Sequence, residues 1–73
     1  MDKNILYNEM FSDKLKYFRK EKQYSQKQVA DMLNVPVSTY ANWEQGRTQP
    51  SIADIYRLLE VLDIEANELF DVN

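Results

Sequence analysis

The chain has 73 residues, a net charge of −3 and neither cysteine nor histidine, which allows one small domain and excludes disulfides, thiolate metal sites and the commonest general base. A hydrophobic fraction of 44% with 29% charged residues is typical of a globular domain, and no signal peptide, membrane-length apolar run or glycine-rich phosphate loop is present. We therefore expect a cytoplasmic protein that avoids membranes, needs no metal or cofactor and is not an enzyme.

The first predicted helix carries three apolar residues on one face. Phe11, Leu15 and Phe18 follow one another at the i, i+4, i+7 spacing of an amphipathic helix. The helix should begin close to Phe11 and fade near residues 22–23. Residues 1–10 form an N-terminal extension that could continue this helix backwards, make an arm or contact a partner.

A second helix has a strong start signal. Ser25 stands three residues before Gln28, the spacing of a capping box in which each side chain satisfies the other residue's backbone N–H. The helix should run from Gln26 to about Leu33 and stop at Asn34, because asparagine accepts the left-handed backbone conformation.

A third helix should follow at once and stop at the only glycine of the chain. Pro36 suits the first turn of a helix, and we expect this helix to continue to Gln45 and end at Gly46. Tyr40 and Trp43, three positions apart, are predicted to face inward and to leave the other face of a short polar segment exposed.

The fourth helix also begins with a capping pattern, Ser51 followed by Asp54. Its apolar stripe is Ile52, Ile55, Leu58, Leu59 and Leu62, and residues 65–70 could add one more turn. The whole pattern predicts an all-α fold, a compact bundle of five short helices within residues 11–73. The expected core consists of Leu15, Phe18, Val29, Ala30, Leu33, Tyr40, Trp43, Ile55, Leu58, Leu59, Leu62 and Leu69.

Residues 26–45 have the pattern of a helix-turn-helix, two helices of about eight residues joined by a short turn. Helices that cross steeply need apolar residues on their inner faces and a small residue where the backbones approach. Ala30 is the small residue, and the apolar positions are filled by Val29, Leu33, Val35, Tyr40 and Trp43. The pattern therefore predicts a packed helix pair around this turn.

Charge is distributed unevenly along the chain. Residues 12–48 hold seven Lys and Arg against four acids, whereas residues 49–73 hold one Arg against six acids. A basic front and an acidic back suggest one face for a polyanion and another held away from it. Solvated charge without a partner is the alternative, and it is the plainer interpretation of the basic run from Lys14 to Lys22.

The segments SQKQVADMLNV (25–35) and STYANWEQGRTQPS (38–51) resemble the Cro/repressor-type helix-turn-helix family, the XRE-like regulators of bacteria and phages. The similarity continues to residue 70 and implies a lambda-repressor-like DNA-binding domain. The chain departs from the family pattern in three ways. Asn34 stands where the family usually has glycine, Pro36 stands where a Ser or Thr cap is common, and the total charge is acidic.

The resemblance implies that Val37, Ser38 and Asn42 read DNA bases. Their chemistry suits this role, because Ser38 can donate or accept a hydrogen bond, Val37 can pack on a thymine methyl group and Asn42 can pair with adenine. Asn42 could instead be an ordinary solvent-facing residue.

The resemblance further implies phosphate contacts at Ser25, Gln26, Thr39, Gln45, Arg47 and Thr48. Free N–H groups at the start of a helix bind anions, which supports Ser25 and Gln26, although capping alone would explain Ser25. Arg47 is the strongest candidate among these residues. Arg19 and Glu44 match the positions of a structural ion pair between the first and third helices.

We expect a sequence-specific transcriptional regulator, a repressor that binds a palindromic operator in double-stranded DNA as a homodimer through the helix at about 36–45. One short helix makes few base contacts, and a two-fold dimer doubles the interface. The alternative is a protein-interaction module, such as the antitoxin of a toxin–antitoxin pair, whose acidic back holds a protein partner. An enzyme has little support, because the serines have no histidine to activate them.

Overall fold

The computed structural model describes the backbone of residues 3–70 and the side chains of residues 10–70. The described backbone forms helices α1 (Lys3–Glu21), α2 (Gln26–Leu33), α3 (Val37–Glu44), α4 (Ile52–Leu62) and α5 (Ala66–Phe70). Residues 3–70 contain no strand, so the predicted all-α fold of five helices is confirmed.

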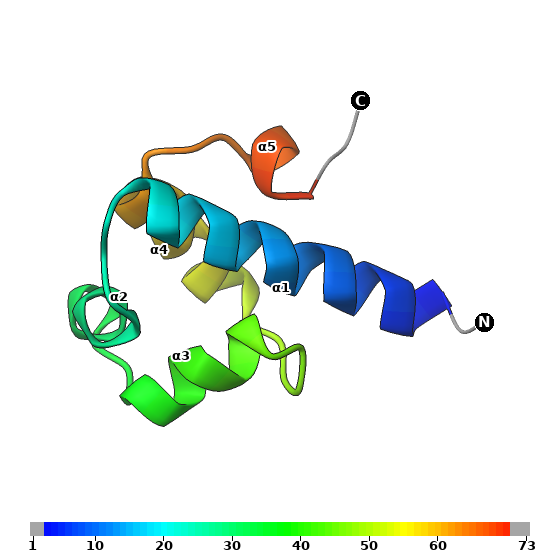
Figure 1. Cartoon of the computed structure of the whole chain (residues 1–73), viewed down its shortest axis with the longest axis horizontal. Coiled ribbons are helices and arrows are strands. Elements are labelled where there is room, and N and C mark those ends of the chain that lie inside the picture. The colour runs from blue at the N-terminus through cyan, green and yellow to red at the C-terminus, as the bar shows by residue number, and fades with distance from the viewer. Residues whose placement is uncertain (1–2, 71–73) are drawn as a thin grey trace.

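The long helix α1 lies along the centre of the molecule, with α3 on one side and α5 on the other (Figure 1). It begins at Lys3, earlier than the apolar spacing predicted, so residues 3–10 continue the first helix. Periodic apolar residues mark only the part of a helix that packs on the core, which is why they could not locate this start. None of the described helices is both long and apolar enough to span a membrane.

Serine capping boxes start α2 and α4, as predicted. The Gln28 N–H donates to Ser25 Oγ at 3.0 Å, and the Ser25 N–H donates to Gln28 Oε1 at 2.7 Å. Ser51 and Asp54 make the same reciprocal pair at the start of α4. Pro36 is the N-cap of α3 and makes no side-chain cap, so this helix begins one residue later than expected.

Helices α1 to α4 each end at a residue in the left-handed conformation. These residues are Gln23, Asn34, Gly46 and Asp63, with φ of 60°, 59°, 73° and 54°. In every case the next residue donates its N–H to a carbonyl five positions back, as Tyr24 does to Arg19 at 3.2 Å. This second hydrogen bond is typical of a Schellman motif. The helix ends are therefore fixed by local backbone geometry, although only one of the four residues is glycine.

The core is close to the predicted one. The fully or almost fully buried apolar residues are Leu15, Val29, Ala30, Leu33, Tyr40, Trp43, Leu58, Leu62 and Leu69, and the half-buried Phe18 and Leu59 pack against them. The expectation was wrong for Ile55, which is only half-buried, and Ile52 of the predicted stripe is 74% exposed. The apolar stripe of α4 is wider than the face that the other helices cover.

Candidate nucleic-acid interface

The turn between α2 and α3 fixes how the two helices are joined. Asn34 adopts φ 59° and ψ 44°, and the Val35 N–H donates to the Ala30 carbonyl at 3.0 Å. Ala30 is fully buried at the point where the chain turns back. These features give the helix-turn-helix arrangement that the sequence predicted.

Two aromatic residues attach α3 to the core. Tyr40 is fully buried and Trp43 is 3% exposed, and their rings meet edge to face with centroids 5.9 Å apart. Such a contact adds to the stabilisation that burial alone provides. Because both rings lie on the inner side of α3, the opposite side of this helix is left at the surface.

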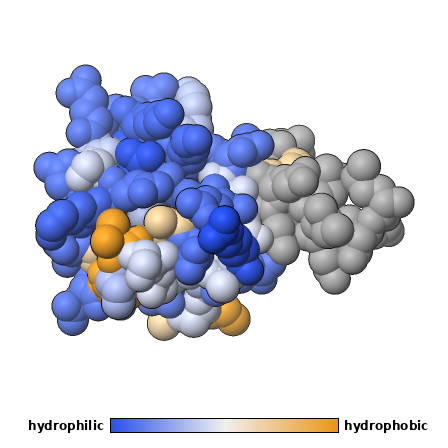
Figure 2. Space-filling model, turned by 60° about the horizontal axis from the view of Figure 1, so that its bottom comes forward, coloured by the Kyte–Doolittle hydropathy of each residue, from blue (hydrophilic) through white to orange (hydrophobic). Residues whose placement is uncertain are grey.

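The three predicted base-reading residues all lie on α3, and none of them is fully buried. Val37 is 46% exposed at the first position of the helix, Ser38 is exposed and Asn42 is half-buried. Ser38 and Asn42 are four positions apart and so share one helix face. Figure 2 brings forward the lower side of the molecule as drawn in Figure 1, where α3 lies, and shows a mostly hydrophilic surface with small apolar areas.

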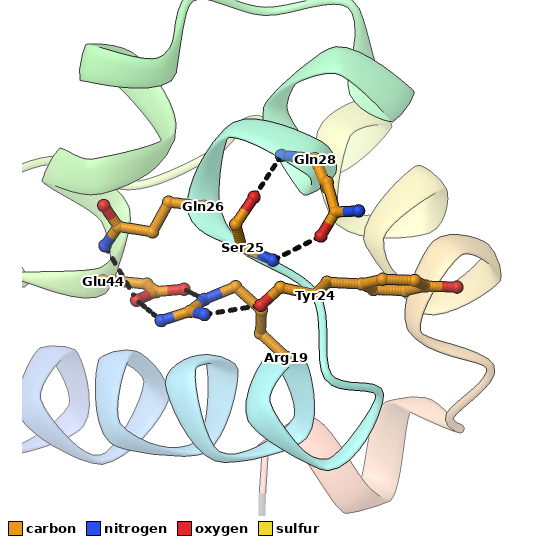
Figure 3. A network of polar contacts seen from close by, with 6 residues as sticks. All are labelled: Arg19, Tyr24, Ser25, Gln26, Gln28 and Glu44. Atoms are coloured by element: carbon orange, nitrogen blue, oxygen red, sulfur yellow. Dashed lines mark hydrogen bonds and ion pairs between the residues drawn. The ribbon is translucent and has the colours of Figure 1, made fainter.

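A buried ion pair joins α1 to the end of α3 (Figure 3). Arg19 donates to both Glu44 carboxylate oxygens, from Nε at 2.6 Å and from a terminal nitrogen at 3.1 Å. Its other terminal nitrogen donates to the Tyr24 carbonyl at 2.7 Å. The Glu44 side chain is only 2% exposed and that of Arg19 11%. The pair that the family resemblance implied is therefore present, with a main-chain partner that side-chain patterns could not reveal.

Gln26 adds α2 to this network. Its Nε2 donates to Glu44 Oε1 at 3.1 Å, so one carboxylate holds side chains from two other helices. Burial acts to raise the pKa of Glu44, but the hydrogen bonds from Arg19 and Gln26 help to hold it below its ordinary value. Glu44 is therefore an ionised link that sets α3 relative to α1 and α2.

Tyr40 lies beside the same network. Its buried hydroxyl makes no hydrogen bond with any of the described residues, and burial raises the pKa of this phenol. Tyr40 is therefore a neutral core residue rather than a participant in proton chemistry.

The predicted phosphate contacts fall into two places. Ser25 and Gln26 stand at the start of α2, and the Gln26–Glu44 hydrogen bond brings this start beside the end of α3. The exposed residues Gln45, Arg47 and Thr48 follow directly after that end. Thr39 is different, because it is half-buried in the first turn of α3, away from this group. The structure thus gathers five of the six candidates around one end of α3.

Some of the basic residues in segment 12–48 already form ion pairs with acidic residues of the same chain. Arg19 is buried against Glu44, Lys27 pairs with Asp31 at 3.0 Å, and Lys22 lies 3.7 Å from Asp63. The Lys27 pair is exposed, and exposed pairs of this kind are weak. Of these three cations only Arg19 is buried and withdrawn from a polyanion, whereas Arg47 lies exposed beside α3.

Comparison with known proteins gives one family. Residues 15–69 match the family model described as "Helix-turn-helix". The chain is 37% identical over 57 residues to the HTH-type transcriptional regulator AnsR of Bacillus subtilis, covering 78% of this chain and 49% of that protein. It is 38% identical over 61 residues to the uncharacterised HTH-type transcriptional regulator YazB of the same organism, covering 84% of this chain and 88% of that protein. The chain therefore spans about half the length of AnsR and most of YazB.

A solved structure has the same fold. The restriction-modification controller protein C.AhdI from Aeromonas hydrophila superposes with a TM-score of 0.81 at 32% identity, covering 86% of this chain and 96% of that one. The likeness extends over almost all of the controller protein, so the arrangement of the helices is shared and not only the helix-turn-helix.

Proposed function

Because the chain belongs to the helix-turn-helix family of DNA-binding transcriptional regulators, we propose that it is a repressor that binds a palindromic operator as a homodimer. In this proposal α3 enters the major groove, which is wide enough for a helix. Val37, Ser38 and Asn42 read base edges there.

The observation that supports this proposal best is the division of α3 into two sides. Tyr40 and Trp43 fix the inner side, while Val37 and Ser38 stay exposed at the start of the helix. In helix-turn-helix proteins the first residues of the recognition helix contact base edges. An exposed and well-anchored helix start is the feature that such reading requires.

The phosphate contacts would be made around the other end of α3. The exposed Ser25 at the start of α2, together with the exposed Arg47 beyond α3, would hold two stretches of the DNA backbone and so set the register of α3 in the groove. A dimer is needed because one such helix offers few base contacts. Its half-sites should lie roughly 10 base pairs apart, or a multiple of this spacing.

The proposal is tested by selecting bound duplexes from a random pool with the full chain. We expect a short palindrome to be recovered and to be bound more tightly than a scrambled duplex of equal length. A matched protein control is Ser38→Ala, which should relax the selected sequence while leaving the fold intact. Recovery of unrelated sequences, or equal binding of palindrome and scrambled duplex at low salt, would contradict the proposal.

A further inference from the structure

Helix α4 has an apolar face that the described chain covers only in part. Leu58 and Leu62 occupy its inner side and are fully buried, whereas Ile52 is 74% and Tyr56 66% exposed. We define the outer α4 face as Ile52, Ile55, Tyr56 and Leu59, of which Ile55 and Leu59 are half-buried. Contiguous exposed apolar side chains of this size are typical of interaction surfaces.

The spacing within the outer α4 face is the same in both directions. Its residues are separated by three, one and three positions, which places all of them on one stripe of the helix. An antiparallel copy of α4 therefore presents the same pattern to the first. Ile52 of one copy then lies opposite Leu59 of the other, and Ile55 lies opposite Tyr56. A surface that matches itself in this way suits a two-fold interface.

Charge also favours the antiparallel arrangement. The exposed residues Glu60 and Asp63 stand at the end of α4, whereas the first turn of the helix holds one acid, Asp54, which caps Ser51. A parallel pair would place these acidic ends side by side. An antiparallel pair keeps the two acidic ends at opposite ends of the interface.

We propose that a second copy of this chain packs antiparallel on the outer α4 face, about a two-fold axis that passes between Ile55 and Tyr56. This inference rests on the proposed dimeric regulator and names the surface that joins its two copies. Four side chains cover less than the ~800 Å² per partner of a standard interface. The dimer is therefore expected to be weak in free solution and to be strengthened when both copies bind one DNA molecule.

The first test compares two exposed tyrosines by sedimentation without DNA. Tyr56 and Tyr17, the latter 57% exposed on α1, each precede a glutamate by four positions. Tyr56→Arg should raise the dimer dissociation constant at least ~10-fold, because it places a charge in an apolar contact. Tyr17→Arg is the matched control and should leave the constant unchanged. Equal dissociation constants for wild type and Tyr56→Arg would overturn the inference.

The second test checks the register, using the absence of cysteine from the chain. Ile52→Cys and Leu59→Cys should form a mixed disulfide when the two variants are oxidised together, since disulfides require closely spaced Cα atoms. Tyr17→Cys, mixed with either variant, should not crosslink. Crosslinking of Ile52→Cys with itself in preference to Leu59→Cys would indicate a parallel pair and contradict the inference.

These outcomes separate the dimer surface from DNA binding. If the wild type dimerises through α4 but selects no DNA sequence, the proposed function fails and the surface stands. If a palindrome is selected but Tyr56→Arg binds it as cooperatively as the wild type, the surface is wrong and the function stands. A wild type that stays monomeric both free and on the palindrome would also overturn the inference, and would leave the outer α4 face to a different protein.

Discussion

Arg19 and Glu44 are 25 positions apart in the sequence and form a two-pronged ion pair, with Nε to Oε2 at 2.6 Å. The pair joins α1 to α3, and Gln26 of α2 donates to the same carboxylate at 3.1 Å. Three helices therefore meet at one buried carboxylate. Charged pairs in such positions need not add net stability compared with apolar residues, but a lost partner leaves a buried charge unpaired.

Arg19→Met should accordingly destabilise the fold by about 3–5 kcal/mol, because Glu44 would stay buried without its cation. Chemical denaturation monitored by circular dichroism measures the loss. The double variant Arg19→Met/Glu44→Leu should recover much of it, since neither residue is then charged. Two single variants whose effects simply add in the double variant would show that the residues are not coupled.

Acid should weaken this link. Because the pKa of Glu44 is held below its ordinary value of 4.5, the unfolded chain takes up this proton at a higher pH than the folded chain does. The stabilisation that ionised Glu44 provides is therefore fully present above the pKa of Glu44 in the unfolded chain. It is lost as the pH falls through the lower pKa of Glu44 in the folded chain. The stability difference between wild type and Glu44→Gln should narrow as the pH is lowered below about 4.5. A difference that stays constant throughout acid titration would contradict the depressed pKa.

The sequence could predict this site only in part. The capping boxes at Ser25 and Ser51 involve neighbours in the chain, so their spacing sufficed to locate two helix starts. The pairing of Arg19 with Glu44 depends on how α1 crosses α3, which no local pattern contains, and it was expected only from the family resemblance. The hydrogen bond from Arg19 to the Tyr24 carbonyl has no side-chain signature at all.

Trp43→Ala should be among the most damaging single substitutions, with a cost of about 3–5 kcal/mol, because the ring is 3% exposed and packs edge to face on Tyr40. Thermal and urea unfolding would measure it. Val37→Ala, at the exposed start of the same helix, is the control and should change stability by no more than ~0.5 kcal/mol. Unchanged melting of Trp43→Ala would show that the ring does not hold α3 to the core.

Gln23→Gly should stabilise the protein. Gln23 has φ 60° at the end of α1, where a side chain costs roughly 1–2 kcal/mol and glycine costs little. Glycine also makes the unfolded chain more flexible, so we expect a net gain of about 0.5–1 kcal/mol in urea unfolding. Glu21→Gly, within α1, is the control and should destabilise by a similar amount. A loss of stability in Gln23→Gly would contradict the assigned backbone conformation.

Left-handed residues also mark where prediction from the sequence was less complete. Asn34 and Gly46 indicate helix ends because their residue types favour positive φ. Glutamine has no such preference, so the left-handed conformation of Gln23 could not be predicted. Ile52 was placed on the apolar stripe of α4, yet the fold leaves it exposed. Apolar spacing identifies a helix face without stating what covers it, and for Ile52 we assign that role to a second copy.

DNA binding should separate two kinds of residue. Arg47→Ala should weaken binding to all sequences alike and make the salt dependence less steep, because a phosphate contact and its counterion release are lost. Asn42→Ala should instead relax the preference at particular base pairs by about 1–3 kcal/mol. Titrations of the selected palindrome and a scrambled duplex at two salt concentrations measure both effects. If Asn42→Ala instead weakened binding to all sequences equally, Asn42 would be a phosphate contact and not a base-reading residue.

The hydrogen bonds to Glu44 also affect how much conformational freedom the helix-turn-helix loses when it binds DNA. With α1, α2 and α3 tied to one carboxylate, the angle between the two helices of the turn is set before DNA arrives. Little conformational freedom of the backbone is then left to be lost on binding, and association can be fast and reversible. If the proposed function holds, adaptation to different operators would come from exposed side chains such as Ser38 and Arg47, and from the DNA, whose own bending would contribute to selection at base pairs that the protein does not contact.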